Sequence, residues 1–330
     1  MHPLNQFWRP VGRPCQEGYR RGLSSRGYYP YGGGVDATND IREFLVSRRA
    51  RITPERAGLP AYGARRRVAG LRREEVALLA GISVEYYTRL ERGSATGASS
   101  DVLEGIARAL QLDEAERAHL VDLLRAATSR PTRRRASQDR VRPTVLRVLE
   151  GITAYPAYLR NGRLDILATN VFGSALYAEV LDGRSLPVNM AQFIFFDRRA
   201  SEFFLDWDDV ANDTVAILRA QAGHDPYDRR LTDLIGELST RSDEFRVRWA
   251  NHNVKFHRSG AKRLHHPVVG DLTLDYEALE LGGDSGQRIN VYSAEPGSPS
   301  WASLQLLASW TATTPPVALD TAMDTAMDER

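Results

Sequence analysis

Residues 71–93 read LRREEVALLAGISVEYYTRLERG, and this stretch decides the fold of the first half of the chain. Gly81 supplies the left-handed backbone that a tight turn between two helices needs, and Ser83 is a residue type that caps the start of a helix. Val76 and Ala77 give the first helix a short apolar face, and Ala77 is small where a second helix must cross closely. The stretch therefore predicts a helix, a tight turn and a second helix.

The second of these helices, residues 83–92, has an inner and an outer side. Tyr87 and Leu90 are three residues apart and point into the core. For Tyr86 the sequence leaves core and surface open. The remaining side chains face outward, and the second helix of a helix–turn–helix presents such side chains to the major groove of DNA. There arginine can bind a guanine edge, glutamate can accept a hydrogen bond from cytosine, and valine or tyrosine can contact a thymine methyl group. The candidate base-reading residues are Val84, Glu85, Tyr86 and Arg89, and Thr88 faces outward beside them as a further DNA-binding candidate.

Arginines flank the same stretch and are candidates for binding phosphate. Arg72 and Arg73 open the first helix, where positive charge and the helix dipole both favour an anion. Arg92 follows the second helix. A preceding triplet is either a solvated loop or a contact to phosphate or to the minor groove, and it consists of Arg65, Arg66 and Arg67.

The charge of the chain supports a DNA-binding role for this stretch only when the two halves of the chain are counted separately. The net charge of all 330 residues is +2, yet residues 1–142 hold 26 basic and 16 acidic side chains, whereas residues 143–330 hold 18 and 26. Residues 40–92 carry 12 arginines and 7 acids. Opposite-sign halves predict two units with different partners, and the length suits about two domains of ~150 residues.

Several classes of protein are excluded by the composition. No run of about 18 apolar residues exists to span a membrane, and residues 1–12 lack the apolar segment of a signal peptide. Cys15 is the only cysteine, so a disulfide framework and a cysteine-based zinc site are excluded. We expect a soluble cytoplasmic, nucleoid-associated protein with no membrane partner and no required cofactor.

The sequence divides into five segments. Residues 1–35 are rich in Gly, Arg and Tyr, and they form a disordered tail, a basic arm, or an untranslated leader if Val35 is the true start. Residues 38–130 predict five helices, the first capped by Asn39 or Asp40. Residues 131–142 are a polar, basic linker, residues 143–312 form the second domain, and residues 313–330 form a disordered tail.

The second domain mixes strand and helix signals. Asn161-Gly162 predicts a two-residue hairpin turn between strands at 156–160 and 163–168. Helices follow at 170–180, 190–196, 208–222 and 228–238, with Gly223 as a C-terminal cap. Strands return at 254–258 and 262–266, around a turn at 259–261, and then at 272–278 and 288–294, before a last helix that begins at Ser298. This order predicts an α+β domain with an antiparallel sheet and helices on one side.

Ligand-binding candidates in this domain compete with ordinary structural roles. Arg160, Asn170 and Asn189 are polar groups beside apolar segments and are candidates to hold a ligand carboxylate, but both asparagines also precede helices that they would cap. Aromatic residues at 193–207 and 249 are candidates to line an apolar cavity or simply to fill the core. The aromatic ligand candidates are Phe193, Trp207 and Trp249.

The histidines and the motif search give catalysis little support. His252 and His257 are five residues apart, and His265 and His266 point to opposite faces of a strand, so neither pair has the spacing of a helical metal site. No nucleophile-elbow, Walker or dinucleotide-binding motif is present.

Taken together, these stretches resemble a known family. Residues 71–93 look like the Xre-type helix–turn–helix shared with phage repressors, and the arginine-rich runs at 48–55 and 65–75 are similar to its MmyB-like subgroup. So are RLDILATN (163–170), NMAQF (189–193), HHPVVG (265–270) and AEPGS (294–298). Thr169 departs from the pattern, in which Trp or Ala is frequent. The resemblance covers about residues 38–312, and it implies a five-helix lambda-repressor-like domain followed by a PAS-like sensor domain for fatty-acid-like ligands.

We therefore predict a transcription regulator that binds a double-stranded DNA operator as a homodimer and senses a small apolar ligand, such as a bound fatty acid or similar lipid. Two alternatives stay open for residues 143–312. One is a DNA-tethered enzyme, for which His265, Asp271 and Glu277 are the candidate groups. The other is a dimerisation module.

Overall fold

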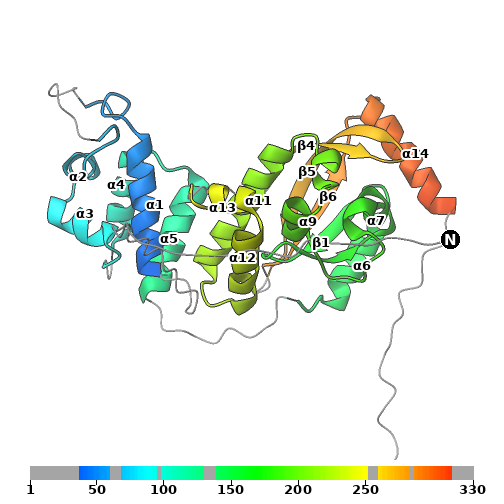
Figure 1. The fold of residues 1–330 in the computed structure, drawn as a ribbon, viewed down its shortest axis with the longest axis horizontal. Helices are drawn as coiled ribbons and strands as arrows, with labels where there is room; N and C mark the ends of the chain where they lie inside the picture. Colours follow the sequence, from blue (N-terminus) through cyan, green and yellow to red (C-terminus); the bar gives the residue numbers. More distant parts are fainter. Residues whose placement is uncertain are drawn as a thin grey trace, which may run out of the picture. The chain divides into compact units, whose positions relative to one another are not determined.

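The computed structural model describes residues 37–59, 68–94, 98–128, 139–251, 259–282 and 286–313. The predicted N-terminal extension, most of the linker and the C-terminal tail lie outside these residues. The first domain contains the five predicted helices, which are α1 (Ala37–Arg51), α2 (Arg73–Ala80), α3 (Val84–Glu91), α4 (Ser100–Ala109) and α5 (Glu114–Thr128) (Figure 1).

One apolar core joins these five helices. Ile41, Phe44 and Leu45 of α1 are fully or almost fully buried against Tyr87 and Leu90 of α3. Where α2 approaches α4, a Cβ on Gly105 would lie 2.6 Å from the backbone oxygen of Ala80, so only glycine permits this close packing. The predicted capping of α1 by Asn39 or Asp40 is wrong, because the helix already begins at Ala37.

The second domain is built on a six-stranded antiparallel sheet in the order β3-β2-β1-β6-β5-β4. The strands are β1 (Ala157–Arg160), β2 (Asp165–Thr169), β3 (Val188–Asn189), β4 (Ser259–His266), β5 (Gly270–Glu280) and β6 (Arg288–Ser293). The predicted alternation in β5 is confirmed, since Leu272, Leu274, Tyr276 and Ala278 are buried and their neighbours are exposed or half-buried. In this strand order β1 pairs with β6, so the first and last thirds of the domain meet in the middle of the sheet.

Helices cover both faces of this sheet, and the expectation of one covered face is therefore wrong. The helices are α6 (Pro143–Gly151), α7 (Val171–Leu176), α8 (Ala178–Leu181), α9 (Met190–Phe196), α10 (Ala200–Phe203), α11 (Trp207–His224), α12 (Arg229–Arg241), α13 (Asp243–Trp249) and α14 (Pro299–Thr313) (Figure 1). Val145 and Leu149 of α6 pack on Ala157 and Leu159. The next side chain along, Tyr158, points to the opposite face and joins the large core under the other helices.

Three local expectations differ from the structure. The hairpin exists, but its loop runs from Asn161 to Leu164, which has the positive φ of 68°, because the Asn161 side chain accepts hydrogen bonds from the backbone N–H groups of Arg163 and Asp165. Residues 259–261 are paired with β5 and form the start of β4 instead of a turn. Gly223 lies inside α11, whose C-cap is Asp225.

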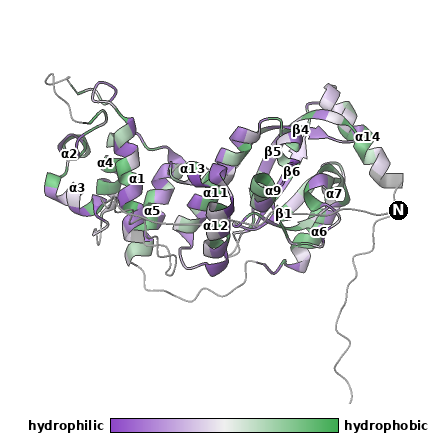
Figure 2. Cartoon of the chain, in the orientation of Figure 1, coloured by the Kyte–Doolittle hydropathy of each residue, from purple (hydrophilic) through white to green (hydrophobic). Residues whose placement is uncertain are grey.

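Hydrophilic and hydrophobic residues alternate along the helices of both domains (Figure 2). Among the described residues, no helix is both long enough and apolar enough to cross a bilayer.

Candidate DNA-binding surface and ligand site

The turn between α2 and α3 has the geometry expected from its sequence. Gly81 adopts φ 69° and ψ 31° and ends α2, and its backbone N–H donates to carbonyl groups of that helix. The Ser83 hydroxyl accepts a hydrogen bond of 3.1 Å from the backbone N–H of Tyr86 and so caps α3. Tyr87 and Leu90 are fully buried, which fixes the rotation of α3 about its axis.

With that rotation fixed, α3 presents a polar outer face. Val84 is 41% exposed, and Glu85 and Arg89 are exposed beside it. Thr88 is half-buried. Tyr86 is also half-buried: it packs against the core, and the Arg89 guanidinium lies 5.2 Å from its ring centroid. The structure therefore brings the predicted base-reading residues together, with Tyr86 positioned to orient Arg89.

The phosphate candidates differ in whether their guanidinium groups are already paired within the protein. Arg92 is exposed at the C-cap of α3, and Arg72 is exposed at the N-cap of α2 with Glu74 3.3 Å away. The triplet 65–67 lies outside the described residues. Arg73 is bound within the protein, because its guanidinium lies 2.9 Å from Glu91.

Glu91 is the functional-site neighbour that sequence reasoning missed. Its carboxylate is 1% exposed and is held by Arg73 of α2 and by Arg49 of α1, with Nε to oxygen distances of 3.0 and 3.3 Å. Arg49 also donates to the backbone oxygen of Leu71. We refer to Glu91, Arg49 and Arg73 as the Glu91 cluster. It ties the three helices that position the recognition face.

In the second domain, Arg160 is the ligand candidate with unused hydrogen-bonding capacity. Its side chain is 3% exposed on the core face of β1, with Nε bound to Asn290 and Nη1 to the backbone oxygen of Asn161. Its Nη2 has no hydrogen-bond partner, and no carboxylate pairs with it among the described residues. Burial lowers the pKa of this guanidinium. Arg160 also lines a pocket with Gly162 and Arg288.

The two asparagine candidates are occupied by structural bonds. Asn170 caps α7, accepting from the N–H groups of Ala157 and Gly173, and its amide donates to two backbone carbonyls. Asn189 caps α9 through Gln192 and donates to Asp165 and to the backbone oxygen of Arg163. Neither amide has a donor left over for a ligand.

The aromatic candidates pack on one another. Phe193 is 3% exposed and meets Phe203 and Phe204 edge to face. Trp207 is half-buried, and its indole N–H donates to the backbone oxygen of Ile194. Trp249 is half-buried and stacks on Phe245. These contacts are those of a packed core, so the structure provides the aromatic residues with a role that needs no ligand.

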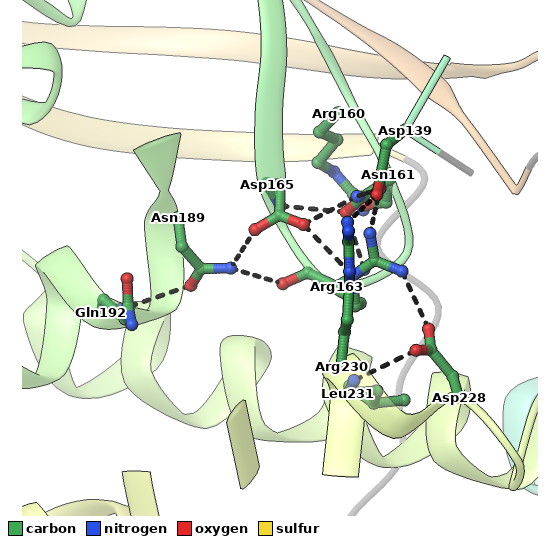
Figure 3. Close-up of polar contacts among 10 residues, drawn as sticks. All are labelled: Asp139, Arg160, Asn161, Arg163, Asp165, Asn189, Gln192, Asp228, Arg230 and Leu231. Atoms are coloured by element: carbon green, nitrogen blue, oxygen red, sulfur yellow. Dashed lines mark hydrogen bonds and ion pairs between the residues drawn. The ribbon is translucent and has the colours of Figure 1, made fainter. Parts of the chain in front are cut away.

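A second polar cluster, also missed by sequence reasoning, surrounds Arg163 (Figure 3). The Arg163 guanidinium is 6% exposed and contacts Asp139, Asp165 and Asp228. Arg230 contacts Asp139 as well. We refer to these five residues as the Arg163 cluster. It borders a pocket of about 720 Å³ whose wall continues over α9 and α12.

The residues considered for catalysis lie on strands. His265 and Asp271 face each other across β4 and β5, with 2.6 Å between Nδ1 and the carboxylate, and both are exposed. His266 is buried, so the predicted opposite faces are confirmed. Glu277 lies opposite Ser259 in the same pair of strands. His252 and His257 lie outside the described residues, and no group of three metal-binding side chains occurs within those that are described.

Comparison with known families gives two matches. The model of the MmyB-like transcription regulator ligand binding domain matches residues 141–307, and a helix-turn-helix domain model matches residues 63–120. No curated protein matches the chain. The first match spans the sheet and its helices, and the second spans the turn at Gly81 and the face of α3.

Proposed function

Because the chain belongs to the MmyB-like transcription regulators, with a helix–turn–helix domain for DNA and a C-terminal domain for a small molecule, we propose how each domain recognises its partner. The outer face of α3 reads an operator in the major groove through Val84, Glu85 and Arg89. The observation that carries this assignment is the complete burial of Tyr87 and Leu90, which leaves α3 one orientation on its core.

The test separates base reading from phosphate binding. An operator is first selected from random double-stranded DNA, and binding is then measured for Arg89→Ala and Arg92→Ala at several salt concentrations. We expect Arg89→Ala to lose about 1–3 kcal/mol of discrimination between operator and unrelated DNA, because arginine can bind a guanine edge with two hydrogen bonds. Arg92→Ala should weaken binding to every sequence and lower the salt slope by about one unit.

Arg73 is unsuitable for this experiment, although it is a phosphate candidate. Its removal would also leave the buried Glu91 with one arginine fewer, and reduced binding would then reflect the stability of the domain. If Arg89→Ala keeps both the affinity and the preference of the wild type, the assigned orientation of α3 is wrong.

For the ligand, we propose an amphipathic acid of the fatty-acid type whose carboxylate binds Arg160. A buried guanidinium without a counter-ion is costly, and a ligand carboxylate would supply both the charge and the hydrogen-bond acceptor that Nη2 lacks. Tyr158, Tyr276 and Tyr292 point from β1, β5 and β6 to the same side of the sheet as Arg160 and provide an aromatic surface for the apolar part of the ligand.

The ligand proposal is tested with matched probes. Purified protein is extracted with organic solvent and the extract is analysed by mass spectrometry, and the stripped protein is titrated with a fatty acid and with the alcohol of the same chain length. We expect the acid to bind more tightly, and Arg160→Gln to abolish the difference. Arg246→Gln, in which the changed arginine is exposed, is the control and should behave as the wild type. Equal affinity for acid and alcohol would refute the role of Arg160, and binding of neither would refute the ligand class.

We further propose a homodimer on a two-fold operator, with α14 at the subunit interface. This helix contains no charged residue, and Trp301 and Leu306 are 40% and 60% exposed on it. Sedimentation velocity of the wild type should show a dimer, and Leu306→Asp should shift it to monomer, because a carboxylate would be buried without a partner. A Leu306→Asp variant that stays dimeric would place the interface elsewhere.

Ligand binding then changes the affinity for the operator. Coupling between such sites is typically about 1–3 kcal/mol, and it is reciprocal, so operator DNA should change the affinity for the fatty acid by the same factor. Titrating the acid with and without operator DNA measures this factor directly. Identical affinities in the two titrations would show that the domains act independently.

A further inference from the structure

The Arg163 cluster contains one residue that does not belong to the folded framework of the ligand-binding domain. Asp165 lies on β2, and Asp228 caps α12 by accepting from the backbone N–H of Leu231. Asp139, in contrast, comes from the end of the predicted linker, four residues before α6 begins. The linker therefore delivers an acid to a buried arginine of the domain that follows it.

Asp139 is bound on both of its carboxylate oxygens. Oδ1 is contacted by the guanidinium of Arg163 and lies 3.3 Å from the amide nitrogen of Asn161 (Figure 3). Oδ2 is contacted by Arg230 of α12. Two positive charges and one amide thus converge on a single carboxylate, which is one-third exposed. Charge-assisted hydrogen bonds of this kind are stronger than neutral ones.

The residues that follow Asp139 continue this attachment. The backbone oxygen of Arg140 accepts a hydrogen bond of 3.3 Å from the Gln287 amide, which is 1% exposed, and Arg142 donates to the backbone oxygen of Gly282. Residues 139–142 therefore form a short strap against the β5–β6 region, and Asp139 is its outermost anchor. Without Asp139, Arg163 would still contact Asp165 and Asp228, so the buried guanidinium keeps two carboxylate partners.

We propose that Asp139 is a releasable latch that holds the end of the interdomain linker on the ligand-binding domain. When it is closed, the linker is shortened by the length of the strap, and the DNA-binding domain has fewer positions available to it. Asp139, Arg163 and Arg230 also line the pocket of about 720 Å³, so any occupant of that pocket that touches the arginines changes the latch equilibrium. This regulatory meaning rests on the proposed function, but the latch itself does not.

The latch is tested by trypsin cleavage of the full chain. Cleavage after Arg140 requires the strap to open, whereas cleavage after Arg133, Arg134 or Arg135 lies outside it and serves as an internal reference. The ratio of the two rates is measured by mass spectrometry at early times. In Asp139→Asn we expect this ratio to rise about fivefold or more, because cleavage follows the population of the open form.

Two further variants make the result specific. Arg230→Gln, in which the lost guanidinium is 71% exposed, should raise the ratio as well. Asp233→Asn removes a negative charge from the same pocket without touching Arg163 or Arg230 in the structure, and its ratio should equal that of the wild type. Tryptophan fluorescence must show the same unfolding midpoint for all three variants, so that cleavage reports the strap and not unfolding.

An unchanged ratio in Asp139→Asn, or an equal rise in Asp233→Asn, would overturn the latch. A second measurement addresses its regulatory meaning. Asp139→Asn should also change the affinity for the selected operator at least twofold, and an unchanged affinity would reject a role in regulation even where the ratio rises. Because cleavage needs neither DNA nor ligand, its outcome is independent of the proposed function.

Discussion

The two domains each contain a buried ion cluster, and the two clusters have opposite designs. In the DNA-binding domain, one buried carboxylate, Glu91, is held by two arginines from α1 and α2. In the ligand-binding domain, one buried guanidinium, Arg163, is held by three aspartates. The first cluster is closed, because all of its members are parts of the five-helix core. The second is open, because Asp139 is supplied by the linker.

This difference indicates what each cluster does. The Glu91 cluster fixes three helices relative to one another and so gives α3 one orientation, which a base-reading helix requires. In the Arg163 cluster, the pairs of Arg163 with Asp165 and Asp228 stay in place while Asp139 is released, and a switch requires such a releasable member. We therefore expect substitutions in the Glu91 cluster to change stability and DNA binding together. A substitution of Asp139 should change only the attachment of the linker.

The largest expected effect is the loss of the central arginine. Arg163→Met should lower the free energy of unfolding of the ligand-binding domain by about 3–5 kcal/mol, because it removes the buried guanidinium that three half-buried carboxylates share. Tryptophan fluorescence reports this domain selectively, since residues 38–130 contain no tryptophan and four of the five tryptophans lie at 207–310. Arg199→Met is the matched control. Arg199 also contacts two aspartates but is 37% exposed, so we expect less than about 1 kcal/mol. Equal losses would show that burial of the guanidinium does not set the cost.

A smaller effect is expected in the closed cluster. Glu91→Gln should lower the stability of the DNA-binding domain by about 1–3 kcal/mol, because it removes the charge that both arginines bind while keeping the shape of the side chain. Of the two arginines that remain, Arg49 is 15% exposed, but Arg73 is 47% exposed and can reach water, and the cost is therefore below that of Arg163→Met. Far-UV circular dichroism of the helices and operator binding provide the measurements. Glu74→Gln, whose carboxylate is exposed, is the control. A normal unfolding curve for Glu91→Gln would show that the charge of the buried Glu91 does not hold the three helices together.

The first domain was largely predictable from its sequence because its decisive signals are local. Gly81, Ser83 and Tyr87 lie within seven residues, and each acts on its immediate neighbours through a positive φ, a cap or one buried ring. The Glu91 cluster was missed for the converse reason. Glu91 and Arg49 are 42 residues apart and meet only because three helices pack together. Sequence reasoning assigned Arg73 to phosphate because nothing local links it to Glu91.

The second domain also depends on contacts between residues far apart in the sequence, and local signals there gave wrong predictions. Asn161-Gly162 correctly predicted the hairpin, but the side chain of Asn161 organises a longer loop, and the strong local signal gave the wrong turn. Gly260 suggested a turn where pairing with Tyr276 makes a strand. The partners of Arg163 lie 24, 2 and 65 residues away, so only the folded sheet and α12 bring them together. The sensor class and its likeness to PAS domains stay predictions from the resemblance.

The smallest expected effect concerns a buried polar group that is neutral, unlike the charged members of the two ion clusters. His266 is 2% exposed; its Nε2 donates to the backbone oxygen of Ala175 at 3.0 Å, and its Nδ1 accepts from the backbone N–H of Val268. Burial lowers its pKa below the ordinary value of 6.5. The unfolded chain therefore binds this proton more readily than the folded one, so the free energy of unfolding falls as the pH drops through about 6.5, by at most about 1.4 kcal/mol per pH unit. His266→Gln removes this titration and should flatten the pH dependence measured by tryptophan fluorescence. A variant with the wild-type slope would show that His266 does not hold its neutral form in the fold.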